Sequence, residues 1–287
     1  MGSKLRQYYQ LVKPGILYTN VLTAFAGYLF ATQWHVDWLL LAYLVIGIGL
    51  VIASACVFNN YIDRGIDAKM ARTQKRALAN GTISAQQALW YATMLGVTGF
   101  AILILGTTML VTMIGLVAFI DYVVLYGWTK RHSVHGTLIG TVSGGASLVA
   151  GYAAGTGRLD WVAAGLFLLM LGWQMPHFYA IAIRRHDDYQ RAGLAMLPVV
   201  KGLKRTKLEM LLYSVVFLAT AAALSFIGPA GWSFAIFMIA IGGWWLGLIL
   251  QGFSTDDDII WAKKVFGFSL IIILVMPIAI SVATLLP

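Results

Sequence analysis

Nine long apolar runs, joined by short polar or charged segments, constrain the fold of this chain more than any other feature. Each run has roughly 20 residues, the length that an α-helix needs to cross the hydrocarbon core of a bilayer. Of the 287 residues, 60% are hydrophobic and only 11% are charged, which excludes an ordinary soluble domain. We therefore predict an all-α polytopic membrane protein with a single transmembrane domain over residues 1–287, in which nine helices surround a central cavity capped by cytoplasmic loops or short helices. The predicted helices span residues 15–33, 38–60, 88–107, 109–128, 137–155, 161–183, 209–227, 230–252 and 263–285.

The basic residues predict how the chain lies in the membrane. Of its 20 Lys and Arg residues, all but Arg158 fall before the first predicted helix or after an even-numbered one. The positive-inside rule places these segments and the N-terminus in the cytoplasm, so an odd number of crossings leaves Pro287 outside. Because the net charge of +9 follows one membrane face, it indicates a lipid bilayer and no nucleic acid as partner. Residues 1–13 do not resemble a cleavable signal, so we expect a multi-pass protein of the bacterial cytoplasmic (inner) membrane.

An amide and two carboxylates stand at the cytoplasmic end of the second predicted helix. Asn59, Asp63 and Asp67 are four residues apart, so they fall on one helical face. Carboxylates beside lipid are costly unless a cation or a water-filled cavity compensates them. Acidic oxygens can hold Mg²⁺, and neighbouring cations can bind a diphosphate that bridges to the metal. The sequence thus predicts a membrane enzyme that handles a diphosphate, and five cations follow the motif: Arg64, Lys69, Arg72, Lys75 and Arg76.

A second charged segment, residues 184–208, lies four helices further along the chain, a spacing that indicates an internal duplication. In this segment Asp187 and Asp188 again stand among cations. Pro176 lies just before it and is expected to kink or open the sixth helix, because proline has no amide hydrogen and clashes with the preceding turn. His177 is then expected to face a cavity rather than lipid.

These motifs resemble those of the UbiA-type intramembrane prenyltransferases. The superfamily pattern N-x-x-x-D-x-x-x-D is present at Asn59, Asp63 and Asp67, and the following R-T-x-x-R segment is present at residues 72–76. Other segments are similar to the haem-prenylating subgroup rather than to its quinone-pathway relatives: Trp173-Gln174-Met175-Pro176-His177, Asp188-Tyr189, Leu197-Pro198-Val199, Lys130-Arg131 and Thr137-Leu138-Ile139-Gly140. The likeness extends from Lys13-Pro14 to the segment Trp261-Ala262-Lys263-Lys264, with Ser147-Leu148 where a proline pair is expected.

The resemblance implies transfer of a farnesyl group from farnesyl diphosphate to a vinyl group of haem B, with Mg²⁺ as cofactor. Asn59, Asp63 and Asp67 are the implied catalytic residues and metal ligands, together with one or both of Asp187 and Asp188. The second acidic motif is looser than the usual spacing, which leaves the choice between those two aspartates open. Contacts with the substrates are expected from Arg72, Arg76, Lys201, His177, Tyr61, Lys130, Arg131 and Arg184.

Four polar residues are assigned less specific roles. Cys56 is the only cysteine, so there is no internal disulfide, and it is interpreted as a small core residue. His177 has no second histidine at a suitable spacing, so we do not expect it to be an axial haem ligand. Asp121 falls within the fourth predicted helix and is expected to face the cavity, to pair with a cation or to lie nearer the surface. Ser84 is expected to open a capping box with Gln87 at the end of the first loop.

Three other functions are compatible with parts of the pattern. A transporter would gather its polar residues near the bilayer midplane, whereas here they lie at helix ends. A prenyltransferase that acts on an aromatic quinone precursor would share the metal motif, but the Trp173–His177 segment argues against it. A non-catalytic haem-binding oxidase assembly protein would bind haem independently of Mg²⁺ and of Asp63. Haem A synthase or terminal-oxidase components are candidate docking partners.

Overall fold

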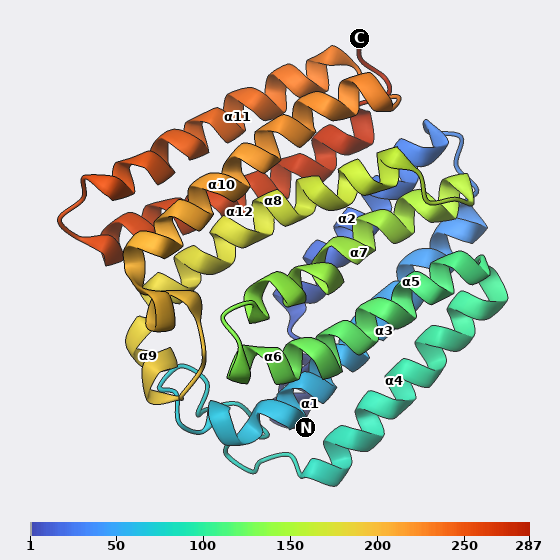
Figure 1. Ribbon diagram of the computed structural model, residues 1–287. Coiled ribbons are helices and arrows are strands. Elements are labelled where there is room, and N and C mark those ends of the chain that lie inside the picture. The colour runs from blue at the N-terminus through green and yellow to red at the C-terminus, as the bar shows by residue number, and fades with distance from the viewer. Residues whose placement is uncertain (1) are drawn as a thin grey trace.

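The computed structural model describes residues 2–287, in which helices are joined by short connections and by one long loop, residues 68–84 (Figure 1). Within those residues, nine helical segments are long and apolar enough to cross a membrane, which confirms the predicted all-α bundle. They are α2 (Pro14–Thr32), α3 (Trp38–Asp67), α4 (Ala85–Gly106), a composite of α5 (Met109–Ile120), a π-helix (Asp121–Leu125) and α6 (Tyr126–His132), then α7 (Gly136–Thr156), α8 (Trp161–Arg184), α10 (Leu197–Ile227), α11 (Trp232–Leu250) with a 3₁₀ turn (Gln251–Phe253), and α12 (Asp258–Val282). Two short helices, α1 (Gly2–Leu11) and α9 (His186–Arg191), complete the set.

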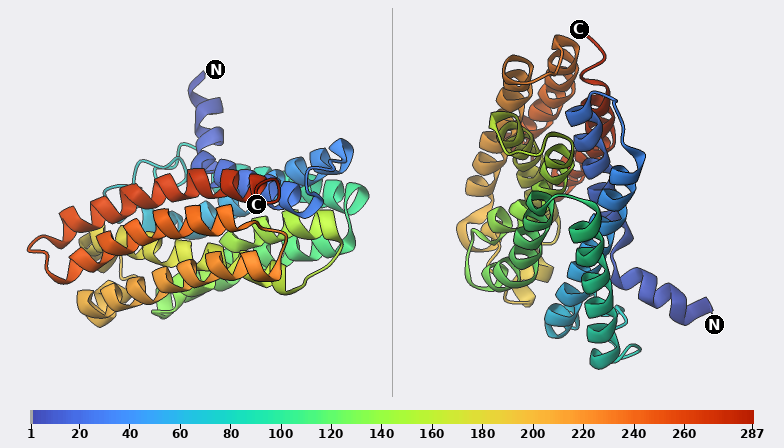
Figure 2. Two further views of the ribbon diagram at one scale, coloured as in Figure 1. Left: turned by 90° about the horizontal axis from the view of Figure 1, so that it is seen from above. Right: turned by 90° about the vertical axis from the view of Figure 1, so that its right-hand side faces the viewer.

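The crossing helices form two groups, with α2 and α7 between them (Figure 1). One group contains α8, α10, α11 and α12, whose shared core includes Phe217 and Trp245. The other contains α3, α4 and α5, with Leu44 and Leu103 in its core. The two termini lie at opposite ends of the bundle, as an odd number of crossings requires, and α1 projects away from it (Figure 2).

Helices α2 and α7 cross with their backbones almost in contact. A Cβ atom added at Gly27 would lie 2.2 Å from a carbonyl oxygen of α7, and one added at Gly151 would lie 2.0 Å from a carbonyl oxygen of α2. Membrane helices commonly use such small residues to approach closely. The crossing also brings the Ser147 hydroxyl to 3.0 Å from Oδ1 of Asn20, to which it donates a hydrogen bond. The glycines therefore fix the spacing of two helices that both face the centre of the bundle.

Two helices extend further beyond the apolar part of the bundle than their apolar runs suggested. α3 continues to Asp67, about two turns past the predicted end at residue 60, and so carries the whole first acidic motif. α10 begins at Leu197 instead of residue 209, and Gly202, with a positive φ of 77°, interrupts its helical backbone after the first turn. Cations of α6 and of the following loop hold the last turns of α3 through its carboxylates. The first turns of α10 are instead largely exposed.

Irregular backbone occurs in the fourth crossing and not at Pro176. α8 is continuous from Trp161 to Arg184, so the expectation that Pro176 opens this helix is not met, and packing against α7, α10 and α12 holds it together. The fourth crossing instead contains the π-helix Asp121–Leu125. Such single-turn π-helices are frequent at functional sites.

The first loop ends as predicted. The backbone N–H of Gln87 donates to Oγ of Ser84 at 3.2 Å, and that of Ser84 donates to Oε1 of Gln87 at 3.1 Å. This capping box begins α4 and satisfies two amides that the first turn of a helix leaves without partners. The loop is thereby anchored at its C-terminal end.

Candidate active site

A cavity of about 570 Å³ lies among α2 to α8 and α12 and confirms the predicted central cavity. Its volume falls in the usual range for small-molecule sites. Near the C-terminal end of α3 its wall is charged. Deeper in the bundle the wall is apolar, with side chains from α3, α4, α7 and α12: Ile48, Val51, Leu103, Ala150 and Ile273. The cavity can therefore take a molecule with a charged head and a long apolar tail.

The first acidic motif forms the charged wall. Its three members line the cavity and are buried, with exposed fractions of 2%, 7% and 3% for Asn59, Asp63 and Asp67. Lys130 and Arg131 of α6 both pair with the carboxylate of Asp63, the guanidinium at 3.3 Å. Arg76 pairs with the carboxylate of Asp67 at 2.7 Å. Each buried carboxylate is thus compensated by cations, as burial of such a group requires.

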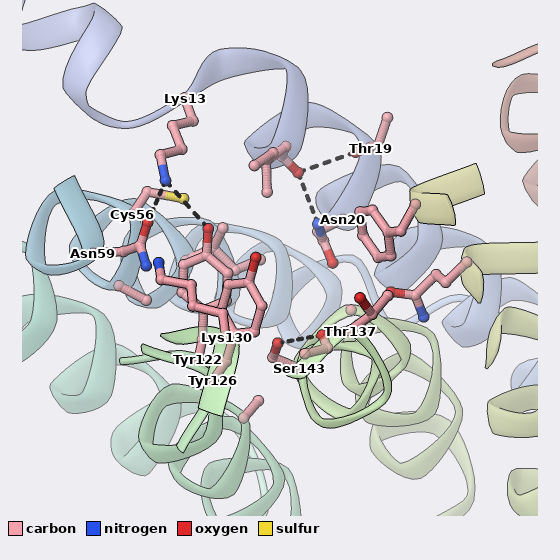
Figure 3. A pocket seen from close by; sticks show the side chains of 18 of the residues that line it. Lys13, Thr19, Asn20, Cys56, Asn59, Tyr122, Tyr126, Lys130, Thr137 and Ser143 are labelled. Atoms are coloured by element: carbon pink, nitrogen blue, oxygen red, sulfur yellow. Dashed lines mark hydrogen bonds between the residues drawn. The ribbon is translucent and has the colours of Figure 1, made fainter. Parts of the chain in front are cut away.

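Lys13 reaches the same end of the cavity from the junction of α1 and α2 (Figure 3). Its backbone is left-handed, with φ of 51°. Its ammonium group donates to Oδ1 of Asn59 at 2.6 Å and to the hydroxyl of Tyr122 at 3.3 Å. Burial lowers the pKa of Lys13 to about 8, which leaves it mostly protonated at neutral pH. Lys13 is therefore a further cation beside the acidic motif.

The π-helix and the first residue of α6 each place one tyrosine in the cavity wall. The rings of Tyr122 and Tyr126 stack with centroids 5.6 Å apart, and the ammonium group of Lys130 lies 4.9 Å from the Tyr126 ring (Figure 3). Asp121 begins the same π-helix but turns towards α7, where its carboxylate accepts a hydrogen bond from the backbone N–H of Ser143 at 3.2 Å. Asp121 is therefore buried, and a backbone amide rather than a cation holds its carboxylate.

The donor set of α3 fits a metal that arrives with its substrate. Among residues 2–287, no three His, Cys, Asp or Glu side chains are assembled as a metal site. Mg²⁺ is usually held by only one or two carboxylates, together with substrate phosphates and water. Asp63 and Asp67 supply two carboxylates, and Asn59 adds an amide oxygen on the same face of α3. Two of the cations that pair with these carboxylates, Lys130 and Arg76, line the same cavity.

The second charged segment contributes cations to the cavity wall more directly than carboxylates. The side chain of Asp187 is 84% exposed and pairs with His186, whereas Asp188 is 12% exposed and pairs with Arg191 at 2.7 Å and Arg185 at 4.0 Å. Neither aspartate lines the cavity. Three neighbours in the same segment do: Arg184, Arg185 and Tyr189. Asp188 is connected to the wall through Arg185, and Asp187 is not.

The other predicted contacts divide between the wall and its surroundings. Four of them line the cavity: Arg72, Arg76, Lys130 and His177. Tyr61, Arg131 and Lys201 do not line it. The ring of Tyr61 packs under the guanidinium of Arg64 at 4.2 Å, and Arg131 approaches Asp63 from outside the wall. Lys201 is exposed near the start of α10.

Aromatic side chains of α8 and α12 form another part of the cavity wall. The ring of His177 stacks on that of Trp173 with centroids 4.8 Å apart, and lies 5.1 Å from the ring of Phe266. Its Nδ1 is 2.7 Å from Oγ of Ser269. These residues offer flat, polarisable surfaces to a planar ligand.

Sequence reasoning missed several residues of the wall. Lys13 was concealed because the positive-inside rule accounts for any cation at that end of a helix. Tyr126 could have been found, since it lies four residues before Lys130 and so shares its helical face. Tyr122 could not, because its orientation depends on the π-helix. Cys56 is buried as predicted, but it also lines the cavity.

A bundle of nine apolar crossings whose cavity joins a buried N-x-x-x-D-x-x-x-D face to an apolar interior defines an intramembrane prenyltransferase. The chain belongs to the UbiA prenyltransferase family, whose model matches residues 20–272. It is 46% identical over 283 residues to the protoheme IX farnesyltransferase of Shigella flexneri, a match that covers 98% of this chain and 96% of that relative. The enzyme of the same name from Escherichia coli strain K12 matches with the same identity and coverage.

Solved structures support the fold independently. A structure of digeranylgeranylglyceryl phosphate synthase superposes with a TM-score of 0.81 at 20% identity and covers 98% of each chain. A UbiA homologue from Archaeoglobus fulgidus bound to GPP and Mg²⁺ superposes with a TM-score of 0.72 at 16% identity, over 96% of this chain and 99% of that one. At these identities the comparison shows a shared fold.

Proposed function

We propose that the chain transfers the farnesyl group of farnesyl diphosphate to a vinyl group of haem B, with addition of water, to produce haem O. The observation that carries this proposal is the 46% identity, over 98% of the chain, to relatives named protoheme IX farnesyltransferase. In the reaction the C1–oxygen bond of farnesyl diphosphate breaks and diphosphate keeps the electron pair. A vinyl carbon bonds to C1, and water adds to the other vinyl carbon as a hydroxyl and releases a proton.

The charged end of the cavity is suited to the leaving group. Loss of diphosphate from an allylic carbon concentrates negative charge on its oxygens, and fixed positive groups stabilise that charge. Mg²⁺, when bound, would supply part of this stabilisation from Asn59, Asp63 and Asp67. The protein cations placed to contact the diphosphate oxygens are Lys13, Arg72, Arg76 and Lys130. Asp188 is a stronger candidate than Asp187 for a further acidic contribution, because it is connected to the wall.

The interior of the cavity is suited to the farnesyl chain and to the allylic cation. Its apolar walls exclude water, which would otherwise capture the cation before the vinyl group does. The stacked rings of Tyr122 and Tyr126 line the cavity beside the ammonium groups of Lys13 and Lys130. An aromatic face attracts a cation, so these rings are placed to stabilise positive charge that develops at C1.

The apolar helices and the basic residues also indicate where in the cell the reaction takes place. The apolar crossings and the basic residues support a bacterial cytoplasmic (inner) membrane location, with the charged end of the cavity on the cytoplasmic side. Farnesyl diphosphate then enters from the cytoplasm and its tail extends into the bundle. A haem A synthase or a terminal-oxidase component is the class of partner that would take up the product.

Product analysis tests the proposal. Purified protein in detergent is supplied with haem B, farnesyl diphosphate and Mg²⁺, and haem products are separated and weighed. We expect a haem heavier by one farnesyl group and one water, absent when the metal is chelated and when Asp63→Asn replaces the wild type. Asp256→Asn, which removes a carboxylate from an exposed loop, is the matched control and should retain the product. Unchanged haem, with prenylation of an aromatic quinone precursor instead, would overturn the assignment of the acceptor.

A further inference from the structure

The two ring nitrogens of His177 have different surroundings. Nδ1 is 2.7 Å from Oγ of Ser269, and that hydroxyl donates its hydrogen to the carbonyl oxygen of Phe266 at 2.6 Å. With its single hydrogen directed to Phe266, Ser269 is assigned as the acceptor of a hydrogen bond from the ring. Nδ1 therefore carries the hydrogen in the neutral imidazole, and Nε2 keeps a free lone pair.

That lone pair is open to the cavity. His177 lines the cavity, and its Nε2 has no hydrogen-bond partner within the described residues. The ring cannot easily turn away, because it stacks on Trp173 at an interplanar angle of 26° and lies at 31° to Phe266. Trp173 is itself fixed, since its Nε1 donates to the carbonyl oxygen of Ser269 at 2.9 Å. A buried, oriented and unprotonated nitrogen thus faces the space where a substrate would lie.

We infer that Nε2 of His177 coordinates the iron of the haem acceptor. This inference rests on the proposed function, because it presumes that haem enters the cavity. Proteins prepare a histidine for metal binding by giving its other nitrogen a hydrogen-bond acceptor, which is the role of Ser269 here. The sequence argued against an axial ligand because His177 has no second histidine, but a five-coordinate haem needs only one. Coordination forms a dative bond from Nε2 to iron and leaves the vinyl groups free to react.

A second contact would orient the porphyrin around that bond. Arg184 lines the cavity on the same helix, seven residues and therefore roughly 10 Å along the axis from His177. Its guanidinium lies 4.5 Å from the centroid of the Phe266 ring, so the same aromatic side chain supports both groups. Arginine binds carboxylates through two parallel hydrogen bonds, and the propionates of haem are its only carboxylates. With propionates at Arg184, the vinyl edge of the porphyrin points away from α9 and into the cavity.

Vibrational spectroscopy of haem-loaded protein tests this inference. Full-length protein in detergent is loaded with haem B and reduced, and the iron–histidine band is recorded by resonance Raman together with the Soret absorption. We expect the band in the wild type, its loss in His177→Gly, and its return when free imidazole is added to that variant. His132→Gly, which removes an exposed histidine from α6, should leave the band unchanged.

Ser269→Ala separates a ligand from a merely structural histidine. Without its acceptor, Nδ1–H donates less charge to the ring, so the band should shift to lower frequency and haem should bind roughly 10-fold more weakly or worse. A band that persists in His177→Gly overturns the inference. A wild-type protein that shows the band but forms no haem O overturns the proposed function alone, whereas haem O formed by wild type without such a band overturns the ligation alone. Stabilisation of His177→Gly by Mg²⁺ and farnesyl diphosphate confirms that the variant is folded.

Discussion

A single methyl group added at Gly151 should separate α2 from α7. The new Cβ would lie 2.0 Å from a carbonyl oxygen of α2, and ordinary van der Waals contact begins at 3.4 Å, so the helices must part by about 1.4 Å. The obstacle is backbone on both sides and cannot rotate away. Overpacking of this kind costs about 1–3 kcal/mol, and we expect the upper end because no side chain can absorb the strain.

The change is measured by reversible unfolding in mixed detergent micelles, with Gly151→Ala compared against Gly243→Ala. A Cβ at Gly243 meets nothing within 4 Å, so that substitution keeps the chemistry of the change and omits the clash. It should be neutral or stabilising by up to about 1 kcal/mol, because alanine favours helix. Gly27→Ala should destabilise as Gly151→Ala does. The double variant should lose less unfolding free energy than the two single variants lose together, since one separation of the helices relieves both clashes.

Activity should fall along with stability in Gly151→Ala. The separation moves Asn20 of α2 away from Ser147 of α7, and both line the cavity. If the free energies of unfolding of Gly151→Ala and Gly243→Ala differ by less than about 0.5 kcal/mol, the close crossing of α2 and α7 does not exist in solution. If stability falls but haem O is formed at the wild-type rate, the crossing is real and its spacing is irrelevant to the reaction.

Two further substitutions test the charged end of the cavity and its loop. Lys13→Gln removes a cation that lies beside Asn59. In steady-state assays it should raise the KM for farnesyl diphosphate by roughly 10-fold or more and leave the KM for haem unchanged. Equal effects on both KM values would contradict a diphosphate contact. Ser84→Ala removes one half of the capping box of α4 and should lower the free energy of unfolding by about 1 kcal/mol in the same assay. Ser84→Asp should keep most of the stability, because aspartate also caps helices. Equal losses in both variants would show that the cap does not contribute to stability.

Apolar runs and charges predicted the architecture of this protein well. The length of each run and the distribution of Lys and Arg are sufficient for nine crossings, because lipid imposes a fixed thickness and a fixed preference for helix. Helix ends were less predictable. α3 continues to Asp67 because packing against the loop and α6, rather than apolarity, supports its last turns.

The site could be predicted at one motif and only in part elsewhere. Asn59, Asp63 and Asp67 share a face because their spacing matches the helical period, so geometry follows directly from sequence. The direction of Tyr122 depends on a π-helix that no local pattern indicates. Lys13 depends on a left-handed turn between two helices. Similarly, Asp187 and Asp188 are neighbours in sequence but have different environments, which are set by the way α9 folds back.

The ion pairs that hold the two buried carboxylates also bear on the order in which ligands arrive. Lys130 and Arg76 can leave Asp63 and Asp67 without a large cost only if another anion receives them at the same moment. A bare divalent ion brings no such anion, whereas a diphosphate that already carries the ion brings one. The ion and the diphosphate are thus expected to bind together, because the diphosphate receives the counterions of both carboxylates.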